Sequence, residues 1–173
     1  MQTRAGALLL AALAAGVVAA SAVAAPSLRV PQLPRKGELV TGVSLGGIRL
    51  GATEADVRST WGSGFVRCPG CTVPTWYYTY PDDPVGAAVS FRRGKVVAVF
   101  TLGSVFGWRT REGLRVGELI ERVVDTYPQM QARGCVGYSA FTTRSPAAVT
   151  SIYVFGEVVY GFALSRPTEP VCQ

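Results

Sequence analysis

Histidine is absent from all 173 residues of the chain. This absence excludes imidazole acid–base catalysis, the Ser-His-Asp and Cys-His mechanisms, and the usual zinc and non-haem iron sites. Acidic residues are also few, 11 against 17 lysines and arginines. The adjacent pair Asp82-Asp83 lies in a proline-bounded turn and has no second acidic cluster to complete a metal site. We therefore expect neither an enzyme nor a metal or other cofactor.

Long basic runs and a lipid-acceptor cysteine are missing as well. The formal net charge is +6 at pH 7, but the basic residues form no dense block, which argues against nucleic acid as a partner. No cysteine lies near the end of the N-terminal apolar segment. Lipid attachment at that point is therefore excluded by chemistry.

Residues 1–24 have the composition of a signal peptide. Arg4 precedes an apolar run, and Ala22-Val23-Ala24 fits the small-x-small pattern recognised by signal peptidase. Cleavage there would release a secreted protein. The alternative is an uncleaved anchor that holds the protein on a membrane, facing outside. Cleavage is favoured because alanine and glycine, which dominate the segment, partition weakly into lipid.

Residues 25–38 contain three prolines and no hydrophobic periodicity, which predicts an extended linker. Beyond the linker, one stretch occurs twice. Residues 47–61 return as residues 113–127 without a gap, with both glycines, the arginine between them, a valine and a threonine unchanged. We interpret this as an internal duplication, with repeat 1 over 39–103 and repeat 2 over 104–173.

Each copy of the duplicated stretch predicts a short helix. In the first copy Thr53 and Asp56 have the spacing of a capping box, and Gly62 is a natural stop. The second helix is expected over 118–127, ended by Pro128. Its predicted apolar stripe consists of Leu119, Ile120, Val123, Val124 and Tyr127.

A strand and a β-hairpin are expected after each helix. The predicted strands are 75–80, 87–92 and 95–102 in the first repeat, and about 138–142, 151–155 and 157–165 in the second. These elements predict an α+β fold of two tandem repeats, each a short helical element packed on an antiparallel β-meander.

Strict alternation in the hairpins predicts which face meets the helices. The hairpins align 62 positions apart, so that Gly94 matches Gly156 and Phe100 matches Phe162. The bulkier face is expected to lie against the helices. It consists of Val96, Ala98, Phe100, Leu102, Val158, Tyr160, Phe162 and Leu164.

The four cysteines of an exported chain favour two disulfides. We expect Cys68 to pair with Cys71 in a tight loop and Cys135 with Cys172 to fasten the C-terminal tail, although crossed pairing stays open. The Cys68-x-x-Cys71 spacing also suits a thiol–disulfide oxidoreductase. Such a site needs a thiolate at a helix N-terminus in a βαβ unit, and the sequence around the pair predicts neither.

Residues 42–46 spell the G-x-S-x-G pattern of a nucleophile elbow. The motif requires a strand before the serine, a helix after it and a histidine base. The histidine is missing and another glycine follows at once. We interpret the segment as a flexible approach to repeat 1.

The Gly-apolar-x-apolar-Gly approach at 47–51 and 113–117, the short helix and the meander resemble a known repeat. It is shared by the β-lactamase inhibitory protein (BLIP-like) family and the SmpA/OmlA-type outer-membrane assembly lipoproteins, and the likeness covers residues 40–165. The resemblance implies sheets placed side by side, with a concave sheet surface that grips a protein partner. No inhibitor contact residue can be matched here, so no β-lactamase inhibition is implied.

Aromatic residues near arginines are the best candidates for binding, because both are enriched at interface hot spots. We expect Tyr77 and Trp108 to be exposed, with Arg109 next to Trp108. Trp76 lies on the opposite face of its strand from Tyr77; we keep it as a binding candidate, although that face is expected to be mostly core.

The function predicted on these grounds is a secreted, non-catalytic protein-binding module. Its sheet surface and inter-repeat aromatics would contact an unidentified extracellular protein. Two alternatives compete with this function. One is an oxidoreductase that uses Cys68 and Cys71, and the other is an envelope structural protein held in the membrane by the uncleaved N-terminal segment.

Overall fold

The computed structural model describes residues 34, 36–79, 86–103 and 107–173. The predicted signal peptide, most of the predicted linker, Tyr80 and the Asp82-Asp83 turn lie outside these residues. No helix in the described part of the chain is long and apolar enough to cross a membrane.

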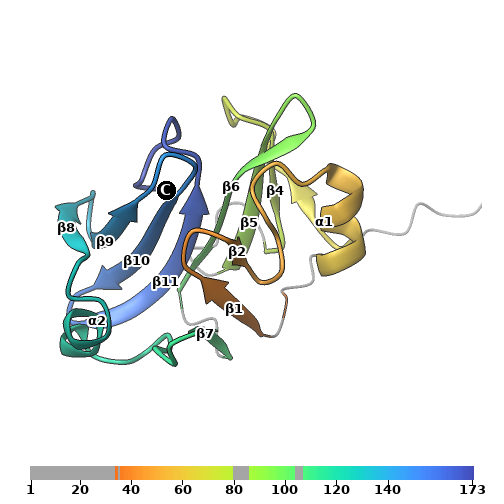
Figure 1. Ribbon diagram of the computed structural model, residues 1–173. Coiled ribbons are helices and arrows are strands. Elements are labelled where there is room, and N and C mark those ends of the chain that lie inside the picture. The colour runs from red at the N-terminus through yellow and green to blue at the C-terminus, as the bar shows by residue number, and fades with distance from the viewer. Residues whose placement is uncertain (1–33, 35, 80–85, 104–106) are drawn as a thin grey trace, which may run out of the picture.

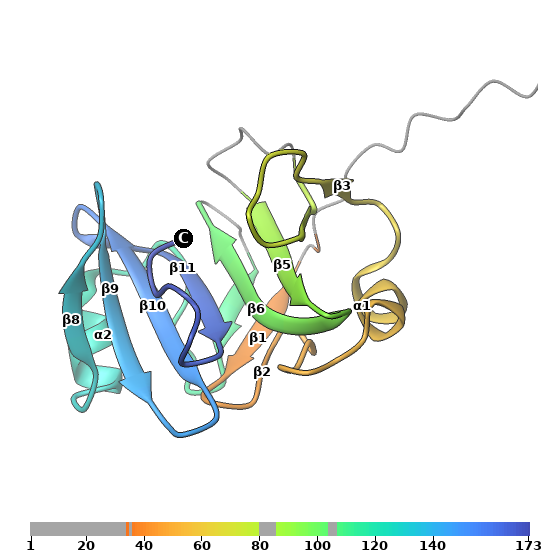
Figure 2. The same cartoon turned by 90° about the horizontal axis from the view of Figure 1, so that it is seen from above.

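An eight-stranded antiparallel sheet forms the body of the protein, and the predicted α+β class is confirmed. The strand order is β3-β4-β5-β6-β11-β10-β9-β8, so each half is a four-stranded meander and the halves meet where β6 pairs with β11. The first half comprises β3 (Val66–Arg67), β4 (Thr75–Tyr77), β5 (Gly86–Arg92) and β6 (Lys95–Leu102). The second half comprises β8 (Gln131–Gly134), β9 (Ser139–Arg144), β10 (Val149–Phe155) and β11 (Val158–Ser165). Figures 1 and 2 show the halves side by side.

Helix α1 (Glu54–Trp61) forms where the capping signal predicts it. Asp56 N–H donates to Thr53 Oγ1 at 3.1 Å, and Thr53 N–H donates to Asp56 Oδ2 at 2.7 Å. The bond from the Thr53 backbone holds the pKa of Asp56 below its usual value. Gly62, at φ 86°, ends the helix, and Val57 and Trp61 are buried.

Helix α2 (Ile120–Thr126) starts without a side-chain cap, because its N-cap residue is Leu119. Its predicted apolar stripe is only partly correct. Val123 and Tyr127 are buried, whereas Leu119 is 54% exposed and Val124 is 51% exposed. The helix is so short that it turns only a narrow face toward the core.

A second, three-stranded sheet of order β2-β1-β7 packs on the same side of the large sheet as the helices (Figure 1). It contains β1 (Gly37–Val40), β2 (Ser44–Leu45) and β7 (Trp108–Thr110), and β1 runs parallel to β7. The predicted linker boundary at residue 38 is therefore wrong, since Gly37 and Glu38 are strand residues paired with Trp108 and Arg109. Ser44 lies in β2 and not in a strand-to-helix turn.

Both hairpins contain a β-bulge, and this makes the predicted faces partly wrong. Ser90 pairs with Ala98 and Phe91 with Val96, so Val97 is left over. In the second hairpin Tyr153 pairs with Gly161 and Val154 with Val159, so Tyr160 is left over. An extra residue breaks the two-residue alternation. As a result Phe100 and Leu102 lie on the face away from the helices, whereas Phe162 and Leu164 lie in the helix-side core as expected.

The two helix starts attach to the hairpins by the same backbone bonds. Gly51 N–H donates to the Val96 carbonyl at 2.8 Å, and Gly117 N–H donates to the Val159 carbonyl at 2.8 Å. Val96 and Val159 are 63 positions apart, whereas the sequence alignment, which matched Gly94 with Gly156, gave 62. The two glycines are not equivalent, because Gly94 is the second residue of its two-residue turn and Gly156 is the first residue of the other turn. These paired bonds support the interpretation of a duplicated unit.

Candidate functional site

The surface of the large sheet that faces away from the helices is called here the outer face. A continuous apolar cluster lies on it and includes Val171 from the C-terminal tail. The sheet residues of the cluster are Ala88, Phe100, Ala140, Val149, Tyr153 and Ala163. The helices, the small sheet and most of the bulky core lie on the other side. The outer face is therefore the surface of the large sheet that neither the helices nor the small sheet covers.

The C-terminal tail, residues 166–173, crosses part of the outer face and is fastened to it. The Tyr153 hydroxyl donates to the Val171 carbonyl at 2.6 Å, and Gln173 N–H donates to the Tyr138 hydroxyl at 2.7 Å. Burial raises the pKa of Tyr153, so its hydroxyl stays a neutral donor. The predicted disulfide between Cys135 and Cys172 is present and fixes the end of the tail to the second half.

A groove of about 490 Å³ lies on the outer face of the first half, and we call it the outer-face groove. Its floor is made by strands β4, β5 and β6, and its walls are the 70–73 loop and the C-terminal tail. The lining residues are Gly70, Cys71, Thr72, Val73, Thr75, Tyr77, Ser90, Arg92, Ala98, Phe100, Glu169, Pro170 and Gln173. On the floor Tyr77 is half-buried and meets Phe100 edge to face, with ring centroids 6.4 Å apart.

Both walls of the groove are cross-linked. The predicted Cys68–Cys71 disulfide closes one wall, where Cys68 N–H also donates to the Thr75 carbonyl at 2.9 Å. This pair lies in the loop between β3 and β4 and not at a helix N-terminus. The other wall ends at Cys172, beside Gln173. Two disulfides fit a secreted protein.

An ion pair ties the tail to the first half of the sheet. Arg92 Nε donates to Glu169 Oε1 at 2.7 Å, and the Glu169 side chain is only 5% exposed. The hydrogen bond to Glu169 raises the pKa of Arg92. Although Arg92 lies at a hairpin tip, its charge is paired, because the tail brings the buried Glu169 carboxylate to it.

Trp108 is buried, so the prediction that it is exposed is wrong. Only 1% of Trp108 is accessible. Its ring packs over Gly37 across the β1–β7 pair, leaving no space for a Cβ atom at Gly37, and meets Trp61 edge to face at 5.7 Å. The indole N–H donates to the Pro34 carbonyl at 3.1 Å. The parallel pairing of β1 with β7 covers the side chain.

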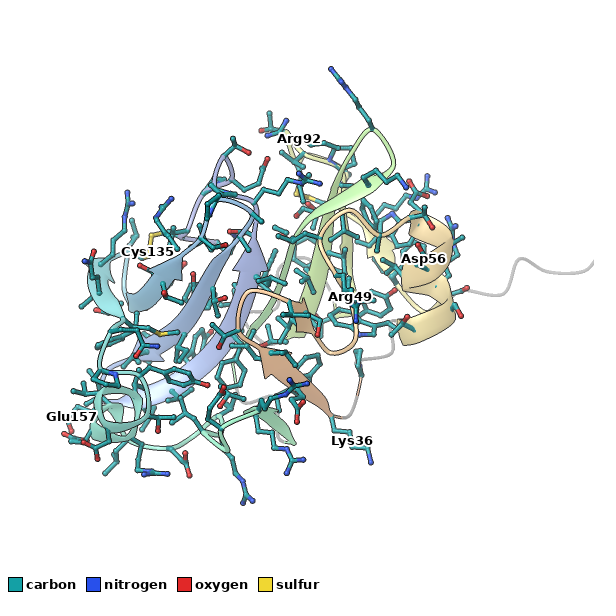
Figure 3. All side chains as sticks on the ribbon, in the orientation of Figure 1. Lys36, Arg49, Asp56, Arg92, Cys135 and Glu157 are labelled. Atoms are coloured by element: carbon teal, nitrogen blue, oxygen red, sulfur yellow. A yellow bond between two sulfur atoms is a disulfide. The ribbon has the colours of Figure 1, made fainter. Side chains whose placement is uncertain are left out.

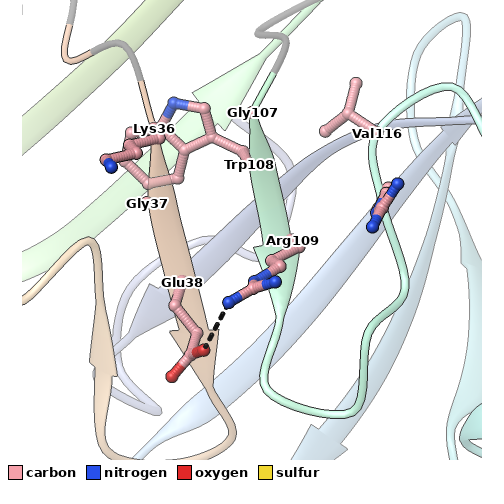
Figure 4. A pocket seen from close by; sticks show the side chains of 8 residues that line it. Lys36, Gly37, Glu38, Gly107, Trp108, Arg109 and Val116 are labelled. Atoms are coloured by element: carbon pink, nitrogen blue, oxygen red, sulfur yellow. Dashed lines mark ion pairs between the residues drawn. The ribbon is translucent and has the colours of Figure 1, made fainter.

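A pocket of about 740 Å³ lies beside this pair and is lined by Trp108 and Arg109. Figure 4 shows Arg109 reaching from β7 toward Glu38 on β1, and the two side chains are 3.9 Å apart. Glu38 also lies 3.6 Å from Arg111. Arg109 is exposed as expected, but its charge is partly balanced by Glu38.

Trp76 is also buried, at 3% exposed, and belongs to the core as its strand face predicted. It stacks on Phe65 at 3.9 Å, with the Arg58 guanidinium 4.6 Å from its ring centroid. Of the four predicted binding residues only Tyr77 and Arg109 reach the surface. They are not brought together, since Tyr77 lies on the outer face and Arg109 on the small sheet.

Phe100 and Glu169 belong to the groove and were not among the predicted binding residues. Phe100 was assigned to the wrong face because the bulge at Val97 has no sequence signal of its own. No sequence pattern marks Glu169 either. The described residues contain no group of three or more acidic or cysteine side chains that could hold a metal ion.

Comparisons with known proteins add little to this geometry. No protein-family model matches the chain, and no curated protein matches it. A crystal structure of an extracellular protein containing a SCP domain, from Bacillus anthracis str. Ames, matches with a TM-score of 0.45 and 13% identity. The match covers 68% of this chain and 44% of that chain, so this chain spans less than half of that protein. At this TM-score the likeness carries no argument, and no family match supports the BLIP-like resemblance.

Proposed function

We propose that the chain is a secreted, non-catalytic protein-binding module that holds a protein partner on its outer face. The observation that carries this proposal is the outer-face groove. Its floor contains half-buried Tyr77 and buried Phe100, and each wall contains a disulfide. Cross-linked walls keep a binding surface in one shape, which lowers the entropic cost of association.

Tyr77 is the anchor that the groove offers. Aromatic residues with one polar atom, partly buried at the centre of a concave surface, are typical of binding hot spots. Burial raises the pKa of Tyr77, which keeps the hydroxyl protonated and able to donate a hydrogen bond to a partner. We do not place Trp108 or Trp76 in the interface, because both side chains are buried.

The lack of histidine supports a role without catalysis, because no imidazole is present to act as a general acid or base. A dithiol enzyme would need a stabilised thiolate, and the loop position of Cys68 and Cys71 between two strands supplies no helix dipole for it. Secretion is supported by the two disulfides and by the composition of residues 1–24.

Photocrosslinking at the groove tests the proposal. The variant protein Tyr77→p-benzoylphenylalanine is added to the secreted fraction of the producing cells and irradiated. One adduct of defined mass is expected, and its amount should saturate as the concentration of the variant is raised. The same replacement at Leu119, which is exposed at the start of α2, is the matched control and should give none. Equal adducts from both positions, or none from Tyr77, would show that the outer face is not the interface.

The partner identified in this way then allows a quantitative test. Tyr77→Ala should weaken its binding about tenfold or more, as expected for a hot-spot residue. Leu119→Ala should leave the affinity unchanged. Thermal unfolding of both variants shows whether a loss of affinity is a loss of fold.

A further inference from the structure

A second groove, of about 680 Å³, lies at the tip of the β5–β6 hairpin, and we call it the basic groove. It is lined by Pro74, Phe91, Arg92, Arg93, Lys95, Val97 and Arg166. Pro74 and Val97 supply apolar surface, and four cations surround it. Figure 3 shows Arg92 at this end of the molecule and Glu157, on the other hairpin tip, at the far end.

Most of this positive charge is not balanced within the described residues. Arg92 is paired with Glu169, but no ion pair of the described part of the chain involves Arg93, Lys95 or Arg166. Asp56 is close enough to Lys95 for the positive charge to contribute to its lowered pKa. Three cations around the groove thus have no carboxylate of the described residues in contact.

The second half of the molecule shows that the fold does not need a cation at the position of Lys95. Lys95 begins β6 directly after the hairpin turn, and Val158 begins β11 at the equivalent place. The backbone bonds to the helix starts are the same in both halves. An apolar residue therefore satisfies the strand position of Lys95, so folding alone gives no reason for a cation there.

Arg93 also occupies an unfavourable backbone conformation. Its φ is 51°, and it is the one described residue other than glycine with a positive φ. Asparagine or glycine is preferred at this position of a two-residue hairpin turn, since the Cβ of other residues crowds the backbone at positive φ. The chain thus carries a guanidinium at the groove against local backbone preference.

We propose that the basic groove binds an acidic segment of the protein partner, with carboxylates on Arg93, Lys95 and Arg166 and an apolar side chain between Pro74 and Val97. Guanidinium groups bind carboxylates through two parallel hydrogen bonds, which gives both strength and orientation. Arg92 lines this groove and the outer-face groove alike, so one partner can occupy both. The inference rests on the proposed function in taking the partner to be a protein.

The test uses the purified protein and a fluorescein-labelled peptide of Asp, Glu and Leu, followed by fluorescence anisotropy. The peptide should bind, and the affinity should fall as salt is raised, because exposed charges are screened. The same peptide with Asn and Gln in place of the acids should not bind. Arg93→Glu with Arg166→Glu should weaken binding of the acidic peptide at least about tenfold.

Arg133→Glu with Arg144→Glu is the matched control, since it makes the same charge change on exposed arginines of β8 and β9. It should leave binding within about twofold of the unchanged protein, since changes at rim charges far from a contact have small effects. Amide shifts of Lys95 and Val97 on peptide addition, measured by NMR with the unsubstituted protein, test the location without relying on variant folding.

Several outcomes would overturn the inference. These are no binding of the acidic peptide, equal binding of the amide peptide, no loss in the Arg93/Arg166 variant, or amide shifts elsewhere. An oligonucleotide of equal charge that binds as tightly would indicate a non-selective anion site. Self-association in sedimentation that the Arg93/Arg166 variant abolishes would indicate a second copy as the occupant. If the acidic peptide binds but Tyr77→p-benzoylphenylalanine gives no adduct, the basic groove is supported as a binding site and the proposed role of the outer face is contradicted.

Discussion

The two halves of the molecule share a backbone plan and differ in the side chains that fill and cover it. The core of the first half is a chain of ring contacts, whereas that of the second is largely aliphatic. The rings in contact in the first half are Trp61, Phe65, Trp76, Tyr78 and Phe91, and Trp108 of β7 joins them. Besides the aromatic residues Tyr127 and Phe162, the second half contributes Val123, Ile152, Val154, Val159 and Leu164. Backbone bonds therefore set this arrangement, and the side chains at equivalent positions are free to diverge.

The helix starts differ in the same way. Thr53 and Asp56 cap α1 with reciprocal bonds, but α2 begins at Leu119 without a side-chain bond. Ile120 N–H donates instead to the Glu157 carbonyl on the hairpin turn, at 2.8 Å. The start of α1 is therefore stabilised by side-chain bonds within its own segment, and the start of α2 by a backbone bond to the turn of the second hairpin.

The largest effect is expected from Trp108→Ala. Removing a fully buried tryptophan should lower the free energy of unfolding by about 3–5 kcal/mol, because the cavity between Gly37 and Trp61 cannot close fully. Urea unfolding measures the loss. Leu119→Ala, at an exposed position of the second half, is the control and should cost less than about 0.5 kcal/mol. A loss below about 1 kcal/mol for Trp108→Ala would mean that the aromatic core is not tightly packed.

The two disulfides should contribute unequally to stability. Cys135 and Cys172 are 37 positions apart, and Cys68 and Cys71 are 3 apart. Chain-entropy arguments give a loss of about 4 kcal/mol for Cys135→Ser with Cys172→Ser and about 2 kcal/mol for Cys68→Ser with Cys71→Ser. Denaturant unfolding of both double variants checks the order. The reverse order would show that the tail adds little to the stability of the second half.

Gly51→Ala and Gly117→Ala should cost the two halves similar amounts. Both glycines have a positive φ, 83° and 91°, and make the same bond to the hairpin, so the cost is conformational and about 1–2 kcal/mol each. Gly70→Ala is the control, because its φ is not positive and nothing lies near its added Cβ. Clearly unequal losses at Gly51 and Gly117 would argue against equivalent helix starts.

Thr53→Ala should destabilise the first half by about 1 kcal/mol through loss of the N-cap. The equivalent change in the second half, Leu119→Ala, removes no cap and should have almost no effect on the same unfolding midpoint. If the two changes prove equal, the capping box contributes nothing and both helices depend on the sheet alone.

The smallest effect expected is a pH dependence confined to the first half. The folded-state pKa of Asp56 is lowered, so its carboxylate contributes stability above its unfolded pKa, near 4, and this contribution is lost as the pH falls through the lower folded value. The difference in unfolding midpoint between the unsubstituted protein and Asp56→Ala should be full at pH 7 and shrink below about pH 4. A difference that stays constant to acid pH would exclude this explanation.

Local signals in the sequence predicted local structure well. The Thr53–Asp56 spacing predicted the capping box, and the β-branched runs on either side of Arg93-Gly94 predicted the first hairpin. Cysteine spacing and compartment predicted both disulfides. The residues that determine the capping box, the hairpin and the Cys68–Cys71 bond lie close together in the chain. Once Cys68 and Cys71 are paired, Cys135 and Cys172 are the two cysteines that remain.

Features that depend on distant segments were not predicted. The parallel pairing of Gly37–Leu39 with Trp108–Thr110 joins segments about 70 residues apart, and it places Trp108 against Gly37, Gly46 and Trp61, where the side chain is buried. The bulges at Val97 and Tyr160 reverse the faces of the strands, and their residues are compatible with a regular strand. Of the outer-face groove, the sequence predicted only Tyr77 as a binding residue. The second wall of the groove is the C-terminal tail, and the path of this tail over the sheet depends on the bond between Cys135 and Cys172, which are far apart in the chain.

The position of Gln173 has a practical consequence for handling the protein. Gln173 lines the outer-face groove and is held there by Tyr138 and the neighbouring disulfide. An affinity tag or fluorescent protein fused after Gln173 would start inside the surface proposed for binding. Immobilisation through such a tag would block the groove, so surface-capture measurements should attach the protein through an engineered site on the helix side of the sheet, such as exposed Val124 on α2.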